Sequence, residues 1–196
     1  MNQAEVLKVF RDFEALLTGH FQLSSGKHSD TYLQCALVLS DPATAEKLCR
    51  ELAESWRAER IETVVGPALG GVVVAYELAR ALGCRGIFAE RKDADMMLRR
   101  GFSLAAGERV LVAEDVVTTG GSAMEVVRLA EQAGAKLVGV TSLIDRGGGR
   151  GFPVRFAALA HVEPPIYEPA RCPLCARSVP IDKPGSRASG AARSGS

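Results

Sequence analysis

Apolar residues follow two different spacings along this chain. They recur with a helical period in residues 3–17, 41–56, 72–83 and 122–130. Short and nearly continuous apolar runs occupy residues 61–65, 86–89, 110–113, 136–144 and 153–162, which is typical of buried strands. Because the strands and helices alternate after residue 40, the pattern predicts an α/β fold.

Two stretches do not fit either spacing clearly. Residues 19–40 mix turn residues with alternating polar and apolar positions, which predicts a strand pair that extends to about Leu37, with a polar turn at residues 24–30. That turn is either a plain hairpin or a contact for an anionic ligand through Lys27 and His28. Residues 90–100 are charged and poorly periodic, so we expect a loop or a hairpin there.

The composition is that of an ordinary globular protein. The chain has 196 residues, of which 47% are hydrophobic and 24% are charged, and its formal net charge of +1 gives no reason to expect nucleic acid or a membrane as partner. No apolar run approaches the roughly 20 residues that span a bilayer, and no signal peptide is recognisable, so we expect a cytoplasmic protein. We expect one domain over residues 1–182, followed by a disordered tail at 183–196 that has no apolar residue larger than Ala.

The most informative stretch is VLVAEDVVTTGGSAMEVV, residues 110–127. Its apolar run predicts a strand whose carboxyl end meets solvent at Glu114 and Asp115. Two adjacent carboxylates would cost several kcal/mol if they were buried without partners, so we expect them to face hydrogen-bond donors or positive charge. Sugar hydroxyls and a divalent cation are the natural candidates.

The segment TTGGS follows directly, from Thr118 to Ser122. Its glycines allow a tight turn with inward N–H groups, and Ser122 is expected to cap the next helix, whose positive end would then face an anion. The order is neither a Walker A loop, which has a Lys after its last glycine, nor a dinucleotide fingerprint, which has no acid pair before its glycines. Each part alone has an ordinary explanation as a turn, a cap or solvated acids, but the joint order predicts a phosphate-binding loop.

The stretch VLVAEDVVTTGGS resembles the ribose-5-phosphate motif of the type I phosphoribosyltransferases. The segments LSSGKHSDTYLQ, VVGPALGGVVVA, FAERK and LIDR resemble, in that order, the hood, the pyrophosphate loop, the catalytic loop and the base-binding strand end of bacterial and archaeal orotate phosphoribosyltransferases. The resemblance covers about residues 18–182. It implies the type I phosphoribosyltransferase fold, a central mostly parallel sheet flanked by helices, with a small N-terminal hood formed mainly by about residues 1–40 together with C-terminal residues.

The resemblance also implies an activity, the transfer of ribose 5-phosphate from phosphoribosyl pyrophosphate to orotate, giving orotidine 5-phosphate and pyrophosphate in pyrimidine (UMP) biosynthesis. The catalytic residues would be Asp115, Glu114 and Lys92. Phosphoribosyl pyrophosphate would be bound by Arg91, Lys92, Glu114, Asp115, Val116, Val117, Thr118, Thr119, Gly120, Gly121 and Ser122. Orotate would be bound by Thr118, Arg146 and Lys27. A guanidinium fork suits the planar carboxylate of orotate, although Arg146 could also be a solvated arginine beside a glycine loop.

The family resemblance further implies Mg²⁺, carried by the substrate near Glu114 and Asp115 without a dedicated protein site, and a homodimer. Two alternatives stay open: a phosphoribosyltransferase for another base, and a non-catalytic regulator that senses phosphoribosyl pyrophosphate. Such regulators usually add a DNA-binding domain or a basic RNA surface, and the sequence shows neither. Orotate, uracil and hypoxanthine as parallel substrates distinguish these possibilities.

Some positions depart from the family pattern. Leu69 and Gly70 stand where many members have a Lys in the pyrophosphate loop, and Asp95 and Met97 stand about where a later Lys and His are usual. Positive charge over the leaving pyrophosphate would then come from other residues, and the candidates are Lys27, Arg99 and Arg100.

The five cysteines form two groups. Cys35, Cys49 and Cys84 lie within expected helices and strands, where a small buried thiol is the ordinary interpretation. Cys172 and Cys175 form CPLC, which has the spacing of half a zinc site, with His161 as the one histidine close by in the sequence. This motif is a metal site, shared across a dimer or not, a local turn with free thiols, or a redox pair.

Overall fold

The computed structural model describes residues 1–23 and 25–184. The predicted tail from residue 185 onward, and Ser24 in the predicted turn, lie outside these residues. The chain forms two compact units. We call Met1–Ala15 with Gln34–Glu163 the sheet unit, and Leu16–Leu33 with Pro164–Ser196 the hairpin unit.

The sheet unit is built on a six-stranded sheet with the order β5-β4-β3-β6-β7-β8. The strands are β3 (Thr63–Pro67), β4 (Arg85–Lys92), β5 (Asp95–Leu98), β6 (Arg109–Val117), β7 (Lys136–Asp145) and β8 (Phe156–His161). All neighbours pair in parallel except β4 and β5, which form an antiparallel hairpin over residues 89–98. The predicted mostly parallel sheet is confirmed, and residues 90–100 are largely a hairpin.

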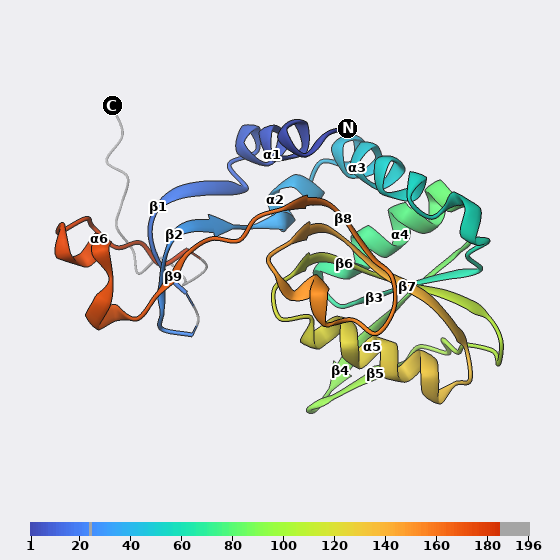
Figure 1. The fold of residues 1–196 in the computed structure, drawn as a ribbon. Helices are drawn as coiled ribbons and strands as arrows, with labels where there is room; N and C mark the ends of the chain where they lie inside the picture. Colours follow the sequence, from blue (N-terminus) through green and yellow to red (C-terminus); the bar gives the residue numbers. More distant parts are fainter. Residues whose placement is uncertain (24, 185–196) are drawn as a thin grey trace. The chain divides into compact units, whose positions relative to one another are not determined.

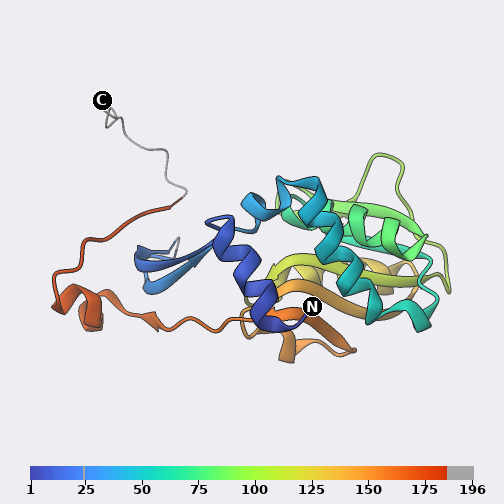
Figure 2. The same ribbon diagram turned by 90° about the horizontal axis from the view of Figure 1, so that it is seen from above.

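Helices cover both faces of this sheet (Figures 1 and 2). They are α1 (Gln3–Asp12), α2 (Cys35–Leu39), α3 (Pro42–Glu54), α4 (Gly70–Leu82) and α5 (Gly121–Gln132), with the short 3-10 turns η1 (Arg57–Glu59) and η2 (Gly148–Gly151). In Figure 1, α3 and α4 lie above the sheet and α5 lies below it. This division follows from chain order, because right-handed crossovers in opposite directions place their helices on opposite faces.

The core lies between the sheet and these helices. On the α5 side, Val65, Val112 and Val140 of three adjacent strands pack with Val126 and Val127 of the helix, and each is at most 1% exposed. These strand residues are β-branched, which suits a strand that is covered on both faces. The core therefore fixes the N-terminus of α5 relative to the end of β6.

The direction of the chain reverses between β3 and β6. From β3 it crosses through α4 to β4 on one side, and from β6 it crosses through α5 to β7 on the other side. At such a point the loops after the two central strands diverge and leave a crevice at the carboxyl ends of the strands, where open α/β sheets bind ligands. A ligand is therefore expected to bind at the ends of β3 and β6.

The hairpin unit contains a three-stranded antiparallel sheet with the order β1-β2-β9. Its elements are β1 (Leu16–Gln22), β2 (His28–Leu33), β9 (Ile166–Tyr167), η3 (Pro169–Arg171) and α6 (Pro173–Ala176). Asp182 adds a bridge to the other side of β1 at Phe21. The pairing of β1 with β2 shifts by one residue between Thr18 and Phe21, so β1 carries a bulge there.

Two predictions for residues 1–40 were wrong. The helix predicted over residues 3–17 ends at Asp12, because Glu14 has a left-handed backbone (φ 53°) and the N–H of Ala15 donates to the carbonyl of Phe10, as in a Schellman motif. Residues 35–39 form α2, not the end of a strand, and their buried positions Cys35, Val38 and Leu39 have helical spacing. In the first place local hydrogen bonding ended a helical spacing early, and in the second place burial outweighed a short alternating pattern.

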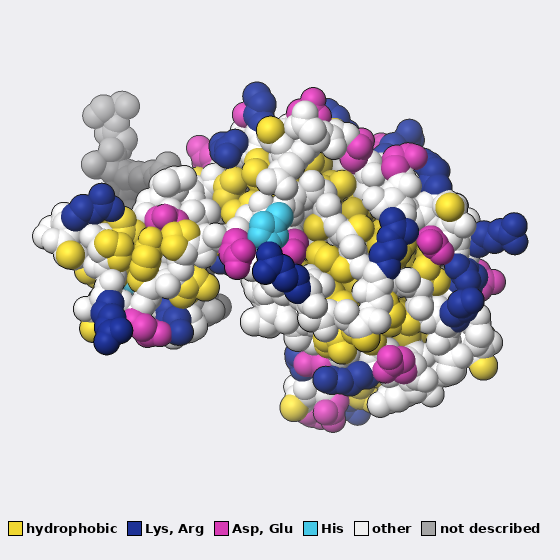
Figure 3. Space-filling view, viewed as in Figure 1, with side chains coloured by type: hydrophobic (Ala, Val, Ile, Leu, Met, Phe, Trp, Pro, Cys, Tyr) yellow, Lys and Arg dark blue, Asp and Glu magenta, His cyan; other side chains and the backbone are white. Residues whose placement is uncertain are grey.

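No helix in residues 1–23 and 25–184 combines the length and the apolar character that a membrane span requires. On the face of the sheet unit seen in Figure 3, acidic and basic side chains are interspersed.

Candidate functional site

The acid pair lies within the carboxyl end of β6, and the strand continues to Val117, beyond the end predicted at Ala113. Glu114 and Asp115 are both partly buried. Since neighbouring residues of a strand point to opposite faces, the two carboxylates bracket the strand end and do not lie side by side on one face. Asp115 faces the start of α4, where a side chain on Gly70 would overlap its carboxylate.

Both carboxyl groups have raised pKa values. Burial, followed by the charge of Asp115, raises the pKa of Glu114 to about 8. Burial also raises the pKa of Asp115, although the N–H of Val116, which donates to its Oδ1 at 2.9 Å, favours the charged form. Ionising both groups in the free protein is therefore costly, and a cation or a developing positive charge at this edge would offset that cost.

The loop after β6 forms a cup around the N-terminus of α5. Gly120 adopts a left-handed backbone (φ 77°) and is the N-cap of α5, so the prediction that Ser122 caps this helix was wrong. No side chain among the described residues caps α5. The Gly121 N–H makes a long contact of 3.4 Å with Thr119 Oγ1, and Thr118 and Thr119 are exposed. First-turn N–H groups without a capping side chain, together with the helix dipole, suit a phosphate group.

The segment that follows β7 supports this cup from the side. A Cβ atom on Gly148 would overlap the carbonyl group of Thr118, and the ring of Phe152 lies next to Gly120. Asp145 braces the segment, because its Oδ1 accepts hydrogen bonds from the N–H groups of Gly147 (2.9 Å) and Gly149 (3.1 Å). The two loops therefore position one another.

His161 holds the other oxygen of Asp145. Its Nδ1 lies 3.1 Å from Asp145 Oδ2, and its Nε2 lies 3.3 Å from Glu163 Oε2. Asp145 was not predicted from the sequence as a bracing residue. An acid two residues before a glycine run was the available signal, since such a residue commonly accepts hydrogen bonds from the following turn.

Arg146 is the first residue after β7. Its N–H donates to the carbonyl of Val117 at 2.7 Å, which ties it to the end of β6, and its Nε is buried with no partner among the described residues. Burial lowers the pKa of its guanidinium group, opposed by the nearby Cys35. The pKa of the buried Cys35 thiol is raised well above its usual value, first by burial and then by Asp115. Arg146, Cys35 and the acid pair thus share one electrostatic environment.

The loop after β3 faces the same crevice. Its peptide bond Ala68–Leu69 is cis, and the N–H of Ala68 donates to the carbonyl of Ala89 at 2.8 Å. The Leu69 side chain in this loop is 86% exposed.

Arg91 and Lys92 lie on the hairpin of β4 and β5 and are both exposed. The Arg91 guanidinium donates to Glu125 Oε1 at 2.8 Å and to the carbonyl of Ala94 at 2.8 Å, so in this structure it is held against α5. Arg99 and Arg100, the candidates for replacing the missing positive charge, both pair with Glu90.

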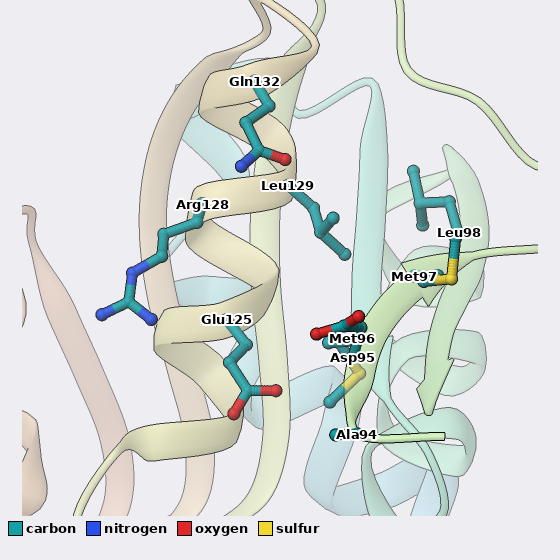
Figure 4. A pocket seen from close by; sticks show the side chains of 9 residues that line it. All are labelled: Ala94, Asp95, Met96, Met97, Leu98, Glu125, Arg128, Leu129 and Gln132. Atoms are coloured by element: carbon teal, nitrogen blue, oxygen red, sulfur yellow. The ribbon is translucent and has the colours of Figure 1, made fainter. Parts of the chain in front are cut away.

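Beside this hairpin lies a hollow of about 710 Å³, shown in Figure 4. It is lined by Ala94–Leu98 and by Glu125, Arg128, Leu129 and Gln132 of α5. Most of these α5 residues belong to its last turns, roughly 10–17 Å along the helix from the phosphate cup. The hollow is therefore distinct from the crevice at the ends of β3 and β6.

The sheet unit thus brings together, at one edge, the ends of β3, β6 and β7 and the start of α5. The residues from Glu114 to Ser122 and Arg146 lie at this edge. Lys27 belongs to the hairpin unit, where its Nζ pairs with Glu168 Oε1 at 2.7 Å.

Comparison with known proteins gives a consistent result. The sequence model of the phosphoribosyl transferase domain family matches residues 39–157. The chain is 51% identical over 190 residues to an orotate phosphoribosyltransferase of Caldicellulosiruptor saccharolyticus, covering 95% of this chain and 98% of the relative. It is 50% identical over 188 residues to one of Caldanaerobacter subterraneus, covering 95% and 99%. Its fold matches the crystal structure of orotate phosphoribosyltransferase from Aeropyrum pernix with a TM-score of 0.68 at 27% identity, over 81% of this chain and 94% of the other.

Proposed function

The chain belongs to the orotate phosphoribosyltransferase family, and we propose from this, together with the geometry of its crevice, that it converts orotate and phosphoribosyl pyrophosphate to orotidine 5-phosphate and pyrophosphate. A ring nitrogen of orotate forms a bond to C1 of the ribose while the bond from C1 to the pyrophosphate oxygen breaks, and the electron pair leaves with pyrophosphate. The base is anionic and the leaving group is good, so no covalent enzyme intermediate is required. Positioning and charge stabilisation carry the rate.

The 5-phosphate of the substrate occupies the cup made by Val116–Ser122. The N–H groups at the start of α5 donate to its oxygens, and the hydroxyl groups of Thr118, Thr119 and Ser122 add donors. The carboxylates of Glu114 and Asp115 accept hydrogen bonds from the ribose hydroxyls. This holds C1 over the crevice between β3 and β6.

The acid pair also has an electrostatic part in the reaction. As pyrophosphate leaves, positive charge develops at the ribose, and the two carboxylates, which are costly to ionise in the free protein, stabilise that charge. Carboxylate oxygens are also ligands that suit Mg²⁺, which would reach this edge with the pyrophosphate group near Glu114 and Asp115. When bound, Mg²⁺ neutralises the phosphate charge.

Arg146 and Thr118 hold orotate. The Nε of Arg146 is a buried donor without a partner in the part of the chain that the structure describes, and a substrate carboxylate would satisfy it in a fork-like pair. Such a donor also favours orotate over uracil, because a base without a carboxylate would leave the buried guanidinium without its partner.

Arg91 and Lys92 contact the pyrophosphate, and Lys92 acts as a catalytic residue by stabilising its developing charge. Arg91 would first break its ion pair with Glu125. This pair is exposed and contributes little to stability. Lys27, in the hood that the resemblance implies for about residues 1–40, is a further candidate for orotate binding, and it would first leave Glu168. The working form is a homodimer in the cytoplasm, and residues 1–182 act as one catalytic domain.

The observation that carries this proposal is the meeting, at one sheet edge, of three features. They are a partly buried acid pair, a helix N-terminus that no described side chain caps, and an arginine whose Nε has no partner in residues 1–23 and 25–184. The test is the loss of orotate absorbance when the purified protein is mixed with orotate, phosphoribosyl pyrophosphate and Mg²⁺, with uracil and hypoxanthine in parallel. We expect turnover of orotate alone. Turnover of another base instead would assign a different base specificity, and binding of phosphoribosyl pyrophosphate without any turnover would indicate a sensor.

A further inference from the structure

Four side chains with metal-binding atoms converge in the hairpin unit, and none of them belongs to the sheet unit. His20 and His28 come from the β1–β2 hairpin, and Cys172 and Cys175 come from the CPLC segment at the start of α6. Their potential ligand atoms, one from each residue, all lie within 4.8 Å of one another. Three of the four residues are buried, Cys175 is exposed, and neither cysteine is in a disulfide.

Four of the six separations between these atoms are close to those of a tetrahedral site, and the other two are at most 4.8 Å. With bond lengths typical of zinc, about 2.3 Å to sulfur and 2.0 Å to nitrogen, a tetrahedron requires N···N separations of about 3.3 Å and N···S separations of about 3.5 Å. Here His20 Nε2 lies 3.0 Å from His28 Nδ1 and 3.5 Å and 3.7 Å from the sulfurs of Cys172 and Cys175. His28 Nδ1 lies 3.3 Å from the Cys175 sulfur.

The protonation of His20 is also suited to a metal ligand. Its Nδ1 lies 2.8 Å from the carbonyl oxygen of Val179, which can only accept, so Nδ1 carries the proton and donates. In the tautomer with its proton on Nδ1, the ring presents a bare Nε2 to the cysteines. A backbone carbonyl that fixes the tautomer in this way is the usual support of a metal-bound histidine.

The bulge in β1 places the two histidines on one face. Before it, Thr18 pairs with Thr31, and this register would pair Phe21 with His28 and turn His20 to the opposite face. After it, Gln22 pairs with His28, and His20 shares the face of Gln22 because side chains alternate along a strand. The irregular strand therefore has a specific result, which is to bring both rings to the CPLC segment.

From this convergence we propose that His20, His28, Cys172 and Cys175 bind one Zn²⁺ ion as a structural site. Four protein ligands close the coordination sphere, so no position remains for a reacting water. The two thiols lose their protons to solvent when the ion binds, and two thiolates balance the charge of Zn²⁺ within a mostly buried site. The sequence suggested His161 as the nearby ligand, but its ring nitrogens contact Asp145 and Glu163.

The ion would stabilise a unit that is small for a hydrophobic core. The hairpin unit consists of two short segments, Leu16–Leu33 and Pro164–Ser196, and scaffolds below roughly 70 residues commonly need a metal or disulfides. Zinc would join these segments, which are 152 positions apart at Cys172 and His20. We therefore expect its removal to loosen the hairpin unit first.

Zinc content is the direct test, measured by mass spectrometry on the full chain purified without a metal-affinity tag. We expect about one zinc per chain, and a loss of more than about nine-tenths of it in the Cys172→Ser, Cys175→Ser double variant. The matched control is Cys84→Ser, a partly exposed cysteine outside the cluster, which keeps its zinc. Equal zinc content in the double variant and the wild type would overturn the proposal.

Two further measurements keep the test decisive if the double variant does not fold. Reduced, metal-free wild type mixed with Co²⁺ should show the visible bands of tetrahedral cobalt and a thiolate charge-transfer band. Zinc removal should speed hydrogen exchange at least tenfold in peptides from Leu16–Leu33, with peptides from β6 unchanged. A reduced chain that binds neither ion, or one whose Cys172 and Cys175 form a reversible disulfide in place of a metal site, would refute a zinc site.

Discussion

At the scale of single residues, Asp115 holds the most exacting position in the crevice. Its carboxylate lies against the backbone of Gly70, where any side chain would overlap it, and it accepts a hydrogen bond from the next N–H. These two contacts fix the position of the Asp115 carboxylate. The reaction uses the negative charge that this carboxylate carries.

We predict that Asp115→Asn lowers kcat/KM for orotidine 5-phosphate formation by at least about a hundredfold, because the amide keeps the shape but not the charge. Steady-state kinetics measure the loss, and circular dichroism checks that the fold is retained. Asp12→Asn, at an exposed position of α1, is the matched control. Near-normal turnover of the Asp115 variant would remove this residue from the mechanism.

The raised pKa of Glu114 predicts that ionising this residue lowers the free energy of unfolding of the ligand-free protein in a pH-dependent way. Its pKa rises from 4.5 to about 8 on folding, so the folded state holds its proton more tightly than the unfolded state. The cost is therefore absent below pH 4.5, grows as pH rises through this window, and is complete above about pH 8.

Glu114→Gln removes this charge, and we expect the variant to melt at a higher temperature than the wild type at pH 9 but at the same temperature near pH 4.5. A cost of at most a few kcal/mol corresponds to about 2–4 °C for each kcal/mol in a chain of this size. Thermal melts across this pH range measure the difference, with the exposed Glu131→Gln as control. A difference that stays constant at all pH values would contradict ionisation of Glu114 as its cause.

At the scale of elements, the phosphate cup depends on a close approach between two loops. Gly148 in η2 leaves no room for a Cβ atom beside the carbonyl of Thr118, whereas Gly151 in the same turn has open space around it. The shape of the cup is therefore set partly by a segment that does not itself contact the phosphate.

We predict that Gly148→Ala displaces the loop after β6 and weakens phosphoribosyl pyrophosphate binding at least tenfold, about 1.4 kcal/mol. Calorimetric titration measures the affinity. Gly151→Ala adds the same methyl group without a neighbour and should bind as the wild type does. Equal affinities of the two variants would show that η2 does not support the cup.

The elements themselves divide into those that the sequence could predict and those that it could not. The strand, acid pair, loop and helix of residues 110–127 are contiguous, so periodicity and turn chemistry were enough to find them. The cap of α5 was misassigned because Ser122 is a good capping residue, and only the left-handed backbone of Gly120 reveals the actual N-cap.

Features that join distant residues could not be predicted. The pair of Asp145 with His161 spans 16 positions, and His20 and Cys172 are 152 positions apart. Neither separation along the chain produces a periodic pattern in the sequence. The CPLC spacing indicated half of a metal site, but its partners depend on a strand register that one bulge changes.

At the scale of the whole molecule, the proposed homodimer can be tested together with the role of Lys92. Lys92 is exposed at the end of β4, so it is free to serve the crevice of a partner subunit. If it does, a hybrid of Asp115→Asn and Lys92→Ala subunits contains one intact site.

We predict that co-refolding these two inactive variants restores roughly a quarter of wild-type turnover, since half of the dimers are hybrids with one of two sites intact. Sedimentation measures the dimer, and each variant refolded alone is the control. A dimer without restored activity would mean that each subunit uses its own Lys92, and a monomer would refute the dimer itself.

The bulge in β1 also marks a place where the length of the chain can change at little cost. Gly19 and His20 together stand opposite the single residue Asp30, between the pairs Thr18–Thr31 and Phe21–Ser29. Loss of Gly19 would leave both of those pairs intact and set His20 directly opposite Asp30, on the face that His28 shares. A homologous chain that is one residue shorter at this point would therefore keep both histidines on one face, and an alignment gap there would signal a straighter strand and not a lost site.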